Sequence, residues 1–170
     1  VGGNFSYTPS EYTEDLEVKD AASVQTPGSL FPEDNILYAN KNLVNIKGNQ
    51  LLQVPKGKAT IWSSYRFPLP GGSDLEVFGT YAWVSEVYYS PFESDFEKAD
   101  AFGRLDFRAN WRSSNNRWGV SVFANNVLDD VGVLQVLREG ESEFFRHSGG
   151  TTLPRLFGVE LTVALGGYSW

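Results

Sequence analysis

The sequence predicts an all-β fold: an antiparallel up-and-down meander of about six strands that forms part of a larger transmembrane β-barrel. Three observations lead to this prediction. Aromatic residues make up 15% of the chain and 17 residues are glycine, while long helical periodicity is absent. Several segments alternate apolar residues with small or polar ones, which is the period of a strand. Short and long connections between these segments alternate along the chain, as they do in outer-membrane barrels.

The first three predicted strands are Val1–Tyr7, Gly57–Phe67 and Leu75–Tyr88. Each places most of its large apolar residues at every second position. In the third strand the alternation is weaker, because Phe78 and Val84 fall among its polar positions. The chain opens inside the first of these strands and contains no methionine, so we expect its N-terminal part to be missing.

The last three predicted strands are Ala101–Arg112, Trp118–Val127 and Arg155–Leu165. Period-two alternation predicts that their apolar residues share an outer, lipid-facing surface, and that the intervening residues line the lumen. The outer set is Leu105, Phe107, Ala109, Phe157, Val159, Leu161 and Val163. The inner set is Arg104, Asp106, Arg108, Glu160 and Thr162, with Phe123 as an apolar exception on the inner side. A soluble sandwich shows the same alternation, so this pattern alone leaves both alternatives open.

The connections favour the membrane alternative. Two are short and rich in turn-forming residues, Pro68–Asp74 and Ser113–Arg117. The other three are long and acidic, about Thr8–Lys56, Tyr89–Asp100 and Leu128–Pro154. A sandwich has no reason to gather its long loops at one end. Trp111 and Trp118 flank a short turn, which is typical of an aromatic girdle at a membrane interface.

Composition excludes several classes of function. The net charge of −7 argues against nucleic-acid binding, and without cysteine the chain can form no disulfide. We find no nucleophile elbow, phosphate loop or metal-ligand spacing, so we expect no enzyme, no cofactor and no metal site. His147 is the single histidine and lies in a predicted loop. The acidic loops have oxygen ligands suited to Ca²⁺, but a solvated outer surface explains them better.

Four segments carry a resemblance to a known family. These are Gly48–Leu51 with Val54–Lys56, then Tyr88–Phe92, then Phe123–Asp130, and finally Pro154–Val159. Together they resemble the C-terminal barrel of TonB-dependent outer-membrane receptors. Phe123–Asp130 is similar to the family's N-L-x-D element, with Val127 where leucine is commonest, and Pro154–Val159 is similar to its P-R-x-[FY]-G-[VLI] segment.

The resemblance implies a location in the outer membrane of a Gram-negative bacterium. It implies that residues 1–170 are the C-terminal segment of a barrel of about 22 strands, whose plug and earlier strands lie outside this chain. The implied function is TonB-energised uptake of a scarce nutrient such as a ferric siderophore, vitamin B12 or an oligosaccharide. The implied partners are outer-membrane lipid, the TonB complex acting through the missing plug, and the nutrient or its chelate.

Candidate ligand contacts come from the loops and the lumen. Aromatic residues of one long connection could stack on a ligand: Tyr88, Tyr89, Phe92 and Phe96. Arg104, Asp106 and Arg108 could line a substrate path, although a salt-bridged lumen wall is the simpler interpretation. Two other functions stay open, a soluble all-β binding module with aromatic-rich loops and a passive porin-like barrel. Detergent dependence separates the soluble module from a membrane protein, because six strands leave unpaired edges and an uncovered apolar face.

Overall fold

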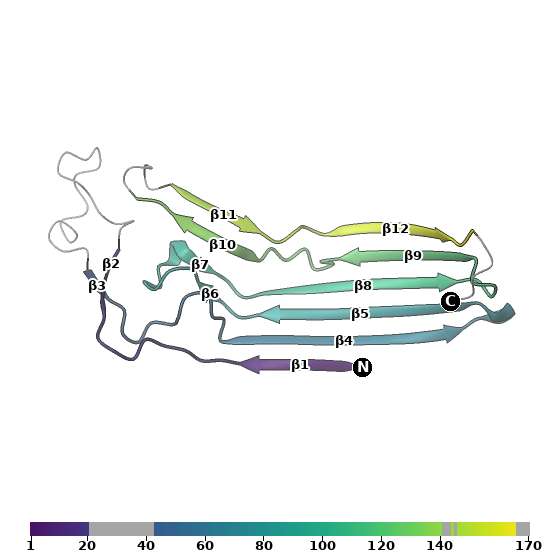
Figure 1. The fold of residues 1–170 in the computed structure, drawn as a ribbon, viewed down its shortest axis with the longest axis horizontal. Helices are drawn as coiled ribbons and strands as arrows, with labels where there is room; N and C mark the ends of the chain where they lie inside the picture. The colour runs from purple at the N-terminus through teal and green to yellow at the C-terminus, as the bar shows by residue number, and fades with distance from the viewer. Residues whose placement is uncertain (21–42, 141–143, 145, 166–170) are drawn as a thin grey trace.

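The computed structural model describes residues 1–20, 43–140, 144 and 146–165. Its main element is one six-stranded sheet in the order β1-β4-β5-β8-β9-β12 (Figure 1). All the pairs in this sheet are antiparallel, and each strand lies beside the next strand of the sheet along the chain. The predicted meander is therefore confirmed. The strands are β1 (Gly2–Tyr7), β4 (Gly57–Pro68), β5 (Asp74–Val84), β8 (Phe102–Arg112), β9 (Trp118–Asn125) and β12 (Leu156–Val163).

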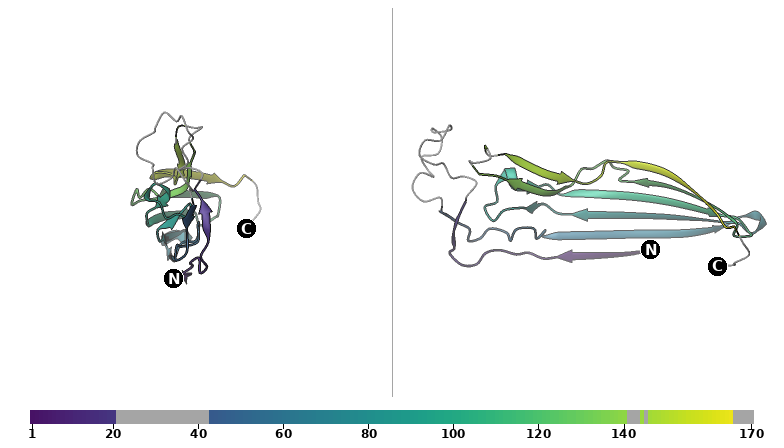
Figure 2. Two further views of the ribbon diagram at one scale, coloured as in Figure 1. Left: turned by 90° about the vertical axis from the view of Figure 1, so that its left-hand side faces the viewer. Right: turned by 45° about the horizontal axis from the view of Figure 1, so that its top comes forward.

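Short two-stranded hairpins occupy the long connections. They pair β2 (Glu17–Lys19) with β3 (Leu43–Asn45), β6 (Val87–Tyr88) with β7 (Lys98–Ala99), and β10 (Val133–Arg138) with β11 (His147–Thr151). A 3₁₀ turn, η3 (Asp95–Glu97), precedes β7, and another, η2 (Pro70–Gly72), forms the turn between β4 and β5. Figure 2 shows the hairpins gathered at one end of an elongated sheet and the short turns at the other. We call these the loop end and the turn end.

Several boundaries differ from the prediction; the last strand, for example, covers Leu156–Val163 and not Arg155–Leu165. The strand predicted at Leu75–Tyr88 stops at Val84. The Ser85 N–H still donates to the Gly57 carbonyl at 2.9 Å, but the Gly57 N–H donates to Ser85 Oγ at 3.1 Å instead of to a backbone carbonyl, so the ladder ends there. The strand predicted at Trp118–Val127 stops at Asn125, since Asn126 has a left-handed φ of 51°. His147, predicted in a loop, begins β11.

The register gives the sheet two chemically different faces, because directly paired residues point to the same side. Leu105 pairs with Tyr81, which pairs with Ile61, while the neighbouring Arg104 pairs with Ala82 and lies on the opposite face. The predicted division into an apolar and a polar set is confirmed by these pairings. Phe123, Phe78 and Trp62 are large apolar residues on the polar face.

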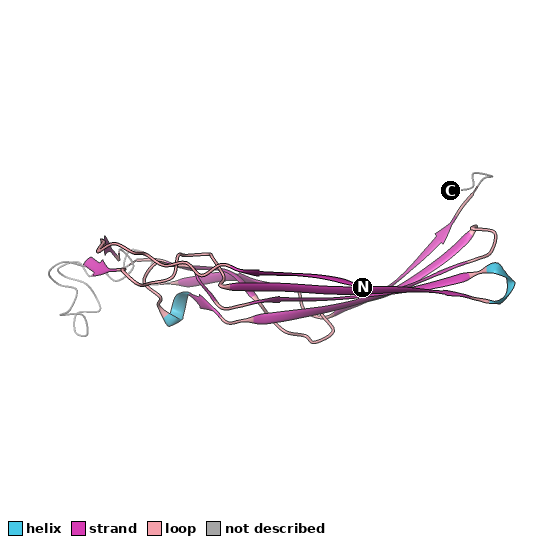
Figure 3. Cartoon of the chain, turned by 90° about the horizontal axis from the view of Figure 1, so that it is seen from below, coloured by secondary structure: helices cyan, strands magenta, loops and turns pink. Residues whose placement is uncertain are grey.

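The sheet is a single layer without a core of its own (Figure 3). Among the described residues, the buried hydrophobic side chains are Ile46, Val87 and Ala99, all at the loop end. On the apolar face, by contrast, Val159 is 72% exposed and Phe157 66% exposed. Monomeric soluble proteins rarely leave so large an apolar surface open, so this face requires a cover from outside the described residues.

Aromatic residues border the apolar face at both ends. Tyr65, Phe67, Trp111 and Trp118 lie toward the turn end, and Phe5, Tyr7, Tyr81 and Trp83 toward the loop end. From Trp83 to Leu75, the pairing partner of Trp111, β5 extends by about 27 Å at ~3.4 Å per residue. At a tilt of about 40° this corresponds to a depth of roughly 21 Å, close to the apolar band of about 25 Å between the two girdles of outer-membrane barrels. In the described part of the chain, no helix is both long and apolar enough to cross a membrane.

Candidate functional site

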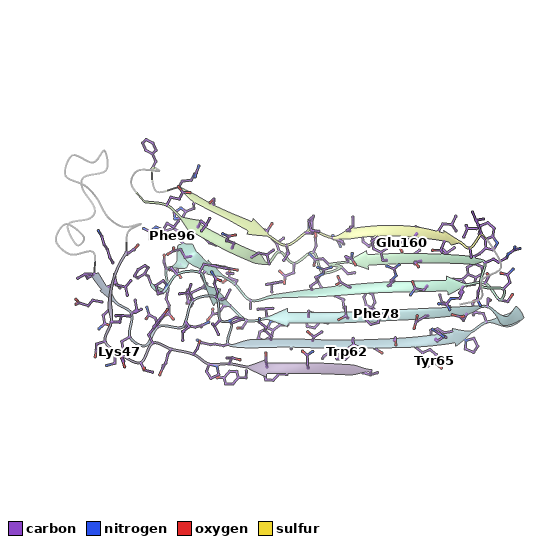
Figure 4. All side chains as sticks on the ribbon, in the orientation of Figure 1. Lys47, Trp62, Tyr65, Phe78, Phe96 and Glu160 are labelled. Carbon is purple, nitrogen blue, oxygen red and sulfur yellow. The ribbon has the colours of Figure 1, made fainter. Side chains whose placement is uncertain are left out.

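Arg108 joins three strands on the polar face. From β8 its guanidinium passes over the ring of Phe123 on β9, with Cζ 5.8 Å from the ring centroid, and forms an ion pair with Glu160 on β12. Its Nε donates to Asn110 Oδ1 at 3.0 Å, and Ser121 Oγ donates to the same oxygen at 2.8 Å. Figure 4 labels Glu160 on β12. Arg108 is thus engaged by an ion pair, a ring contact and a hydrogen bond at the same time.

Phe123 reaches over the sheet because its partner on β12 is glycine. Phe123 pairs directly with Gly158, and a β-carbon at position 158 would overlap its ring. The glycine therefore lets the ring lie flat on the backbone of β12 beneath Arg108. An apolar residue on the polar face becomes the support for a guanidinium, which is a favourable cation–π arrangement.

Arg104 and Asp106 form a second polar group nearer the loop end. Arg104 Nε lies 2.8 Å from Asp106 Oδ1, and the same carboxylate oxygen accepts the N–H of Asn126 at 2.8 Å. Asn126 is almost fully buried, and its Nδ2 donates to the carbonyls of Asp130 and Leu153 at 3.0 and 3.1 Å. Asp106 therefore fixes the point where the chain leaves β9.

The two C-terminal motifs contact each other at this point. Asp129 Oδ1 accepts the backbone N–H of Arg155 at 2.9 Å, and Oδ2 lies 3.3 Å from the Arg155 guanidinium. The next carboxylate, Asp130, accepts the N–H of Gly103 at 2.8 Å. The segments Phe123–Asp130 and Pro154–Val159, noted separately in the sequence, are thus one junction that aligns β8, β9 and β12.

The two earlier motifs also meet. Asn49 Nδ2 donates to the Pro91 carbonyl at 2.8 Å, and the Gln53 N–H donates to the Tyr88 carbonyl at 2.8 Å. Within the second motif, Ser90 Oγ donates to the buried carboxylate of Glu97 at 2.8 Å. Sequence analysis did not single out Glu97, because a lone acid in an acidic loop gives no signal of burial.

The predicted aromatic residues do not form one cluster. Tyr89 is half-buried and its hydroxyl donates to the Val133 carbonyl at 2.9 Å; burial raises the pKa of this phenol. Burial, followed by the negative charge of Glu86, also raises the pKa of Tyr88. Phe96 is 70% exposed and stacks on His147, with ring centroids 5.5 Å apart. Phe92 is half-buried, and no ring contact within the described residues joins two of these four side chains.

The predicted residues therefore lie in two separate regions. Arg104, Asp106 and Arg108 line the polar face of the sheet, whereas the aromatic residues belong to the connection around β6, η3 and β7. A pocket of about 300 Å³ lies where the two regions approach each other, and Tyr89 is one of its lining residues. Its other lining residues include Lys58, Val84 and Phe102, which sequence analysis missed because only the register of β4, β5 and β8 brings them together. No group of three or more acidic or histidine side chains suited to a metal ion occurs in the described part of the chain.

A protein-family model matches most of the chain. The family model described as "TonB dependent receptor-like, beta-barrel" matches residues 1–127 of the 170-residue chain. The match includes β1, β4, β5, β8 and β9, so it covers most of the six-stranded sheet. No curated protein and no solved structure matches the chain.

Proposed function

The chain belongs to the TonB-dependent receptor-like β-barrel family, and from that premise we propose that it is the C-terminal part of a receptor for energised nutrient uptake. The family consists of outer-membrane receptors and transporters rather than enzymes. In the proposed receptor the earlier strands complete the barrel, and a plug outside residues 1–170 contacts TonB. The proposed nutrient is a ferric siderophore, vitamin B12 or an oligosaccharide.

The observation that carries this proposal is the uncovered apolar face between two aromatic girdles. Leu161 and Val159 are 66% and 72% exposed. Directly paired residues form rows across the sheet, and on this face no row between that of Ile61 and that of Val163 contains a charged side chain. In water such a face costs free energy, whereas in a bilayer lipid chains cover it. The polar face, with Arg66, Arg104 and Arg108 in ion pairs, suits a water-filled or plugged lumen.

The candidate ligand contacts remain part of the proposal. Arg104, Asp106 and Arg108 would line the route through the lumen, and Tyr88, Tyr89, Phe92 and Phe96 would approach the ligand at the loop end. Because Arg108 is already bonded to Glu160 and Asn110, its main contribution is to stabilise the arrangement of β8, β9 and β12 in the wall of the lumen. The exposed ring of Phe96 is more available to a ligand than the half-buried Tyr89.

Uptake in cells tests the proposal. The full-length protein is expressed in a Gram-negative host with or without TonB, and labelled ferric siderophore, cyanocobalamin and maltooligosaccharide are supplied. We expect the protein in the outer-membrane fraction and TonB-dependent uptake of one ligand class, with an empty vector as control. Equal uptake without TonB would favour a passive porin instead.

Solubility separates the soluble binding module from the membrane protein. Residues 1–170 are purified with and without detergent and examined by sizing and thermal melting. We expect aggregation in plain buffer, because the apolar face and the edges of β1 and β12 are open. A monodisperse monomer that melts cooperatively without detergent would contradict the membrane proposal.

A further inference from the structure

The pocket of about 300 Å³ at the loop end is formed by three segments that are distant in sequence. They are the segment leading into β4, the connection from β5 to β8, and the start of β10. The lining residues include Lys58, Val84, Val87, Tyr89, Ala99 and Phe102. Its volume is at the lower end of the range for small-molecule sites, about 300–1,000 Å³.

The floor of the pocket is the last row of the polar face. Lys58 pairs with Val84, and Val84 pairs with Phe102, so the three side chains share one side of the sheet. This row lies beyond Arg104 toward the loop end. If the sheet is the wall of a receptor lumen, the pocket is at its outer mouth, where a ligand first arrives.

The walls of the pocket are fixed and largely apolar. Val87 and Ala99 pair directly across the β6–β7 hairpin and are both buried. Tyr89 uses its hydroxyl to hold the Val133 carbonyl at 2.9 Å, so it anchors β10 against the pocket and offers a ligand only its ring. A ligand that fits must therefore bring an apolar body.

The two charged side chains that line the pocket, Asp100 and Lys58, differ in whether they have an ion-pair partner. Asp100 is paired with Lys98, whose Nζ lies 3.1 Å away, and this bond raises the pKa of Lys98. Lys58 is exposed and forms no ion pair with any described residue. Lys98 Nζ also lies 4.0 Å from Glu86, so it is shared between two carboxylates. Lys58 is therefore the ammonium group beside the apolar floor that has no carboxylate partner among the described residues.

We propose that this pocket binds the apolar part of an organic anion, whose carboxylate or other anionic group pairs with Lys58 Nζ. The body of the anion lies against Phe102 and Val84. This inference rests on the proposed receptor function and narrows it: the imported nutrient, or the molecule that carries it, presents an amphipathic acid at the outer mouth. A neutral oligosaccharide would not fit this chemistry.

Binding to the purified full-length receptor tests the inference. The probes are 2-naphthoate and its uncharged counterpart 2-naphthamide, measured in detergent by calorimetry. We expect the acid to bind about two- to fivefold more tightly than the amide, because an ion pair with an exposed lysine is screened by solvent. Lys58→Met should abolish this preference and Lys58→Arg should keep it. Lys56→Met is the matched control, because Lys56 is an exposed lysine that does not line this pocket.

Four results would overturn the inference: no binding of the acid, equal binding of acid and amide, full binding by Lys58→Met, or equal loss in Lys56→Met. The uptake experiment is independent of these results. Uptake without naphthoate binding would reject only this pocket. Lys58-dependent binding without TonB-dependent uptake would reject only the proposed receptor function.

Discussion

An arginine scan along β12 tests which face meets lipid. The turn end of this strand is marked by Val163, which pairs with Trp118 of the girdle. At ~3.4 Å per residue, Leu161 lies about 7 Å from Val163 along the strand and Val159 about 14 Å. With a tilt of about 40°, these distances correspond to depths of roughly 5 and 10 Å below the girdle. The middle of an apolar band about 25 Å thick is therefore much nearer to Val159 than to Leu161.

The expected costs follow from these depths. An arginine facing lipid costs about 2–4 kcal/mol at the midplane and ~0–1 kcal/mol near the interface. We therefore expect Val159→Arg to destabilise the full-length barrel by about 2–4 kcal/mol and Leu161→Arg by about 1 kcal/mol. Thr162→Arg is the control, because Thr162 lies on the polar face in the row of Asp74 and Arg112. Its cost should stay within about 0.5 kcal/mol, as is usual for surface changes.

The assay is guanidinium unfolding of the receptor folded into lipid vesicles, followed by tryptophan fluorescence. The order of the three variants decides the question. Equal midpoints for Val159→Arg and Thr162→Arg would refute a lipid-facing assignment. A larger loss of unfolding free energy for Leu161→Arg than for Val159→Arg would refute the placement of the girdle at Trp118 and Val163.

Three further predictions concern single contacts. Asp129→Ala should cost about 1–2 kcal/mol in the same unfolding assay, because it removes the bond to the Arg155 N–H and a half-exposed ion pair. Asp95→Ala, in an exposed turn, should leave the midpoint unchanged. Gly158→Ala should cost about 1–3 kcal/mol because it displaces the Phe123 ring, and adding Phe123→Ala should remove most of that penalty; independent, additive effects would argue against the contact. Because the pKa of Tyr89 is raised above 10.0, its stabilising contribution is complete below that pH and is lost as the pH rises through the folded pKa. Tyr89→Phe should remove this alkaline loss, and a tyrosinate absorbance titration should show one fewer late-titrating phenol.

The faces of the sheet could be predicted because they depend on a local property. The side chain of each strand residue points opposite to its neighbour, so Leu105 and Arg108 are assigned to different faces from the sequence alone. The hairpin of β10 and β11 could not be predicted in this way. β11 reads His147-Ser148-Gly149-Gly150-Thr151 and has no apolar alternation. Its pairing with β10 depends on backbone hydrogen bonds, which leave no mark on residue types.

For the candidate site, the sequence predicted the face on which each residue lies but not the contacts between the residues. The alternation of side chains along the strand placed Arg108 on the polar face. Its bond to Glu160 could not be predicted in this way, because the two residues are 52 positions apart in the sequence. The floor of the loop-end pocket was missed for a related reason: Lys58, Val84 and Phe102 come together only through the register of β4, β5 and β8. Contacts of this kind depend on topology, which a local pattern does not contain.

The positions of the motifs separate structural residues from candidate ligand contacts. Asp129 contacts Arg155, and Asn49 contacts Pro91, so each motif is bonded to another motif at the loop end. Residues engaged in such contacts have few hydrogen-bonding groups left for a ligand. Lys58 and the ring of Phe96 lie outside the motifs and remain exposed. It follows that Asp129, Arg155 and Asn49 align the strands. We propose that exposed side chains outside the motifs, such as Lys58 and Phe96, contribute most to ligand selection.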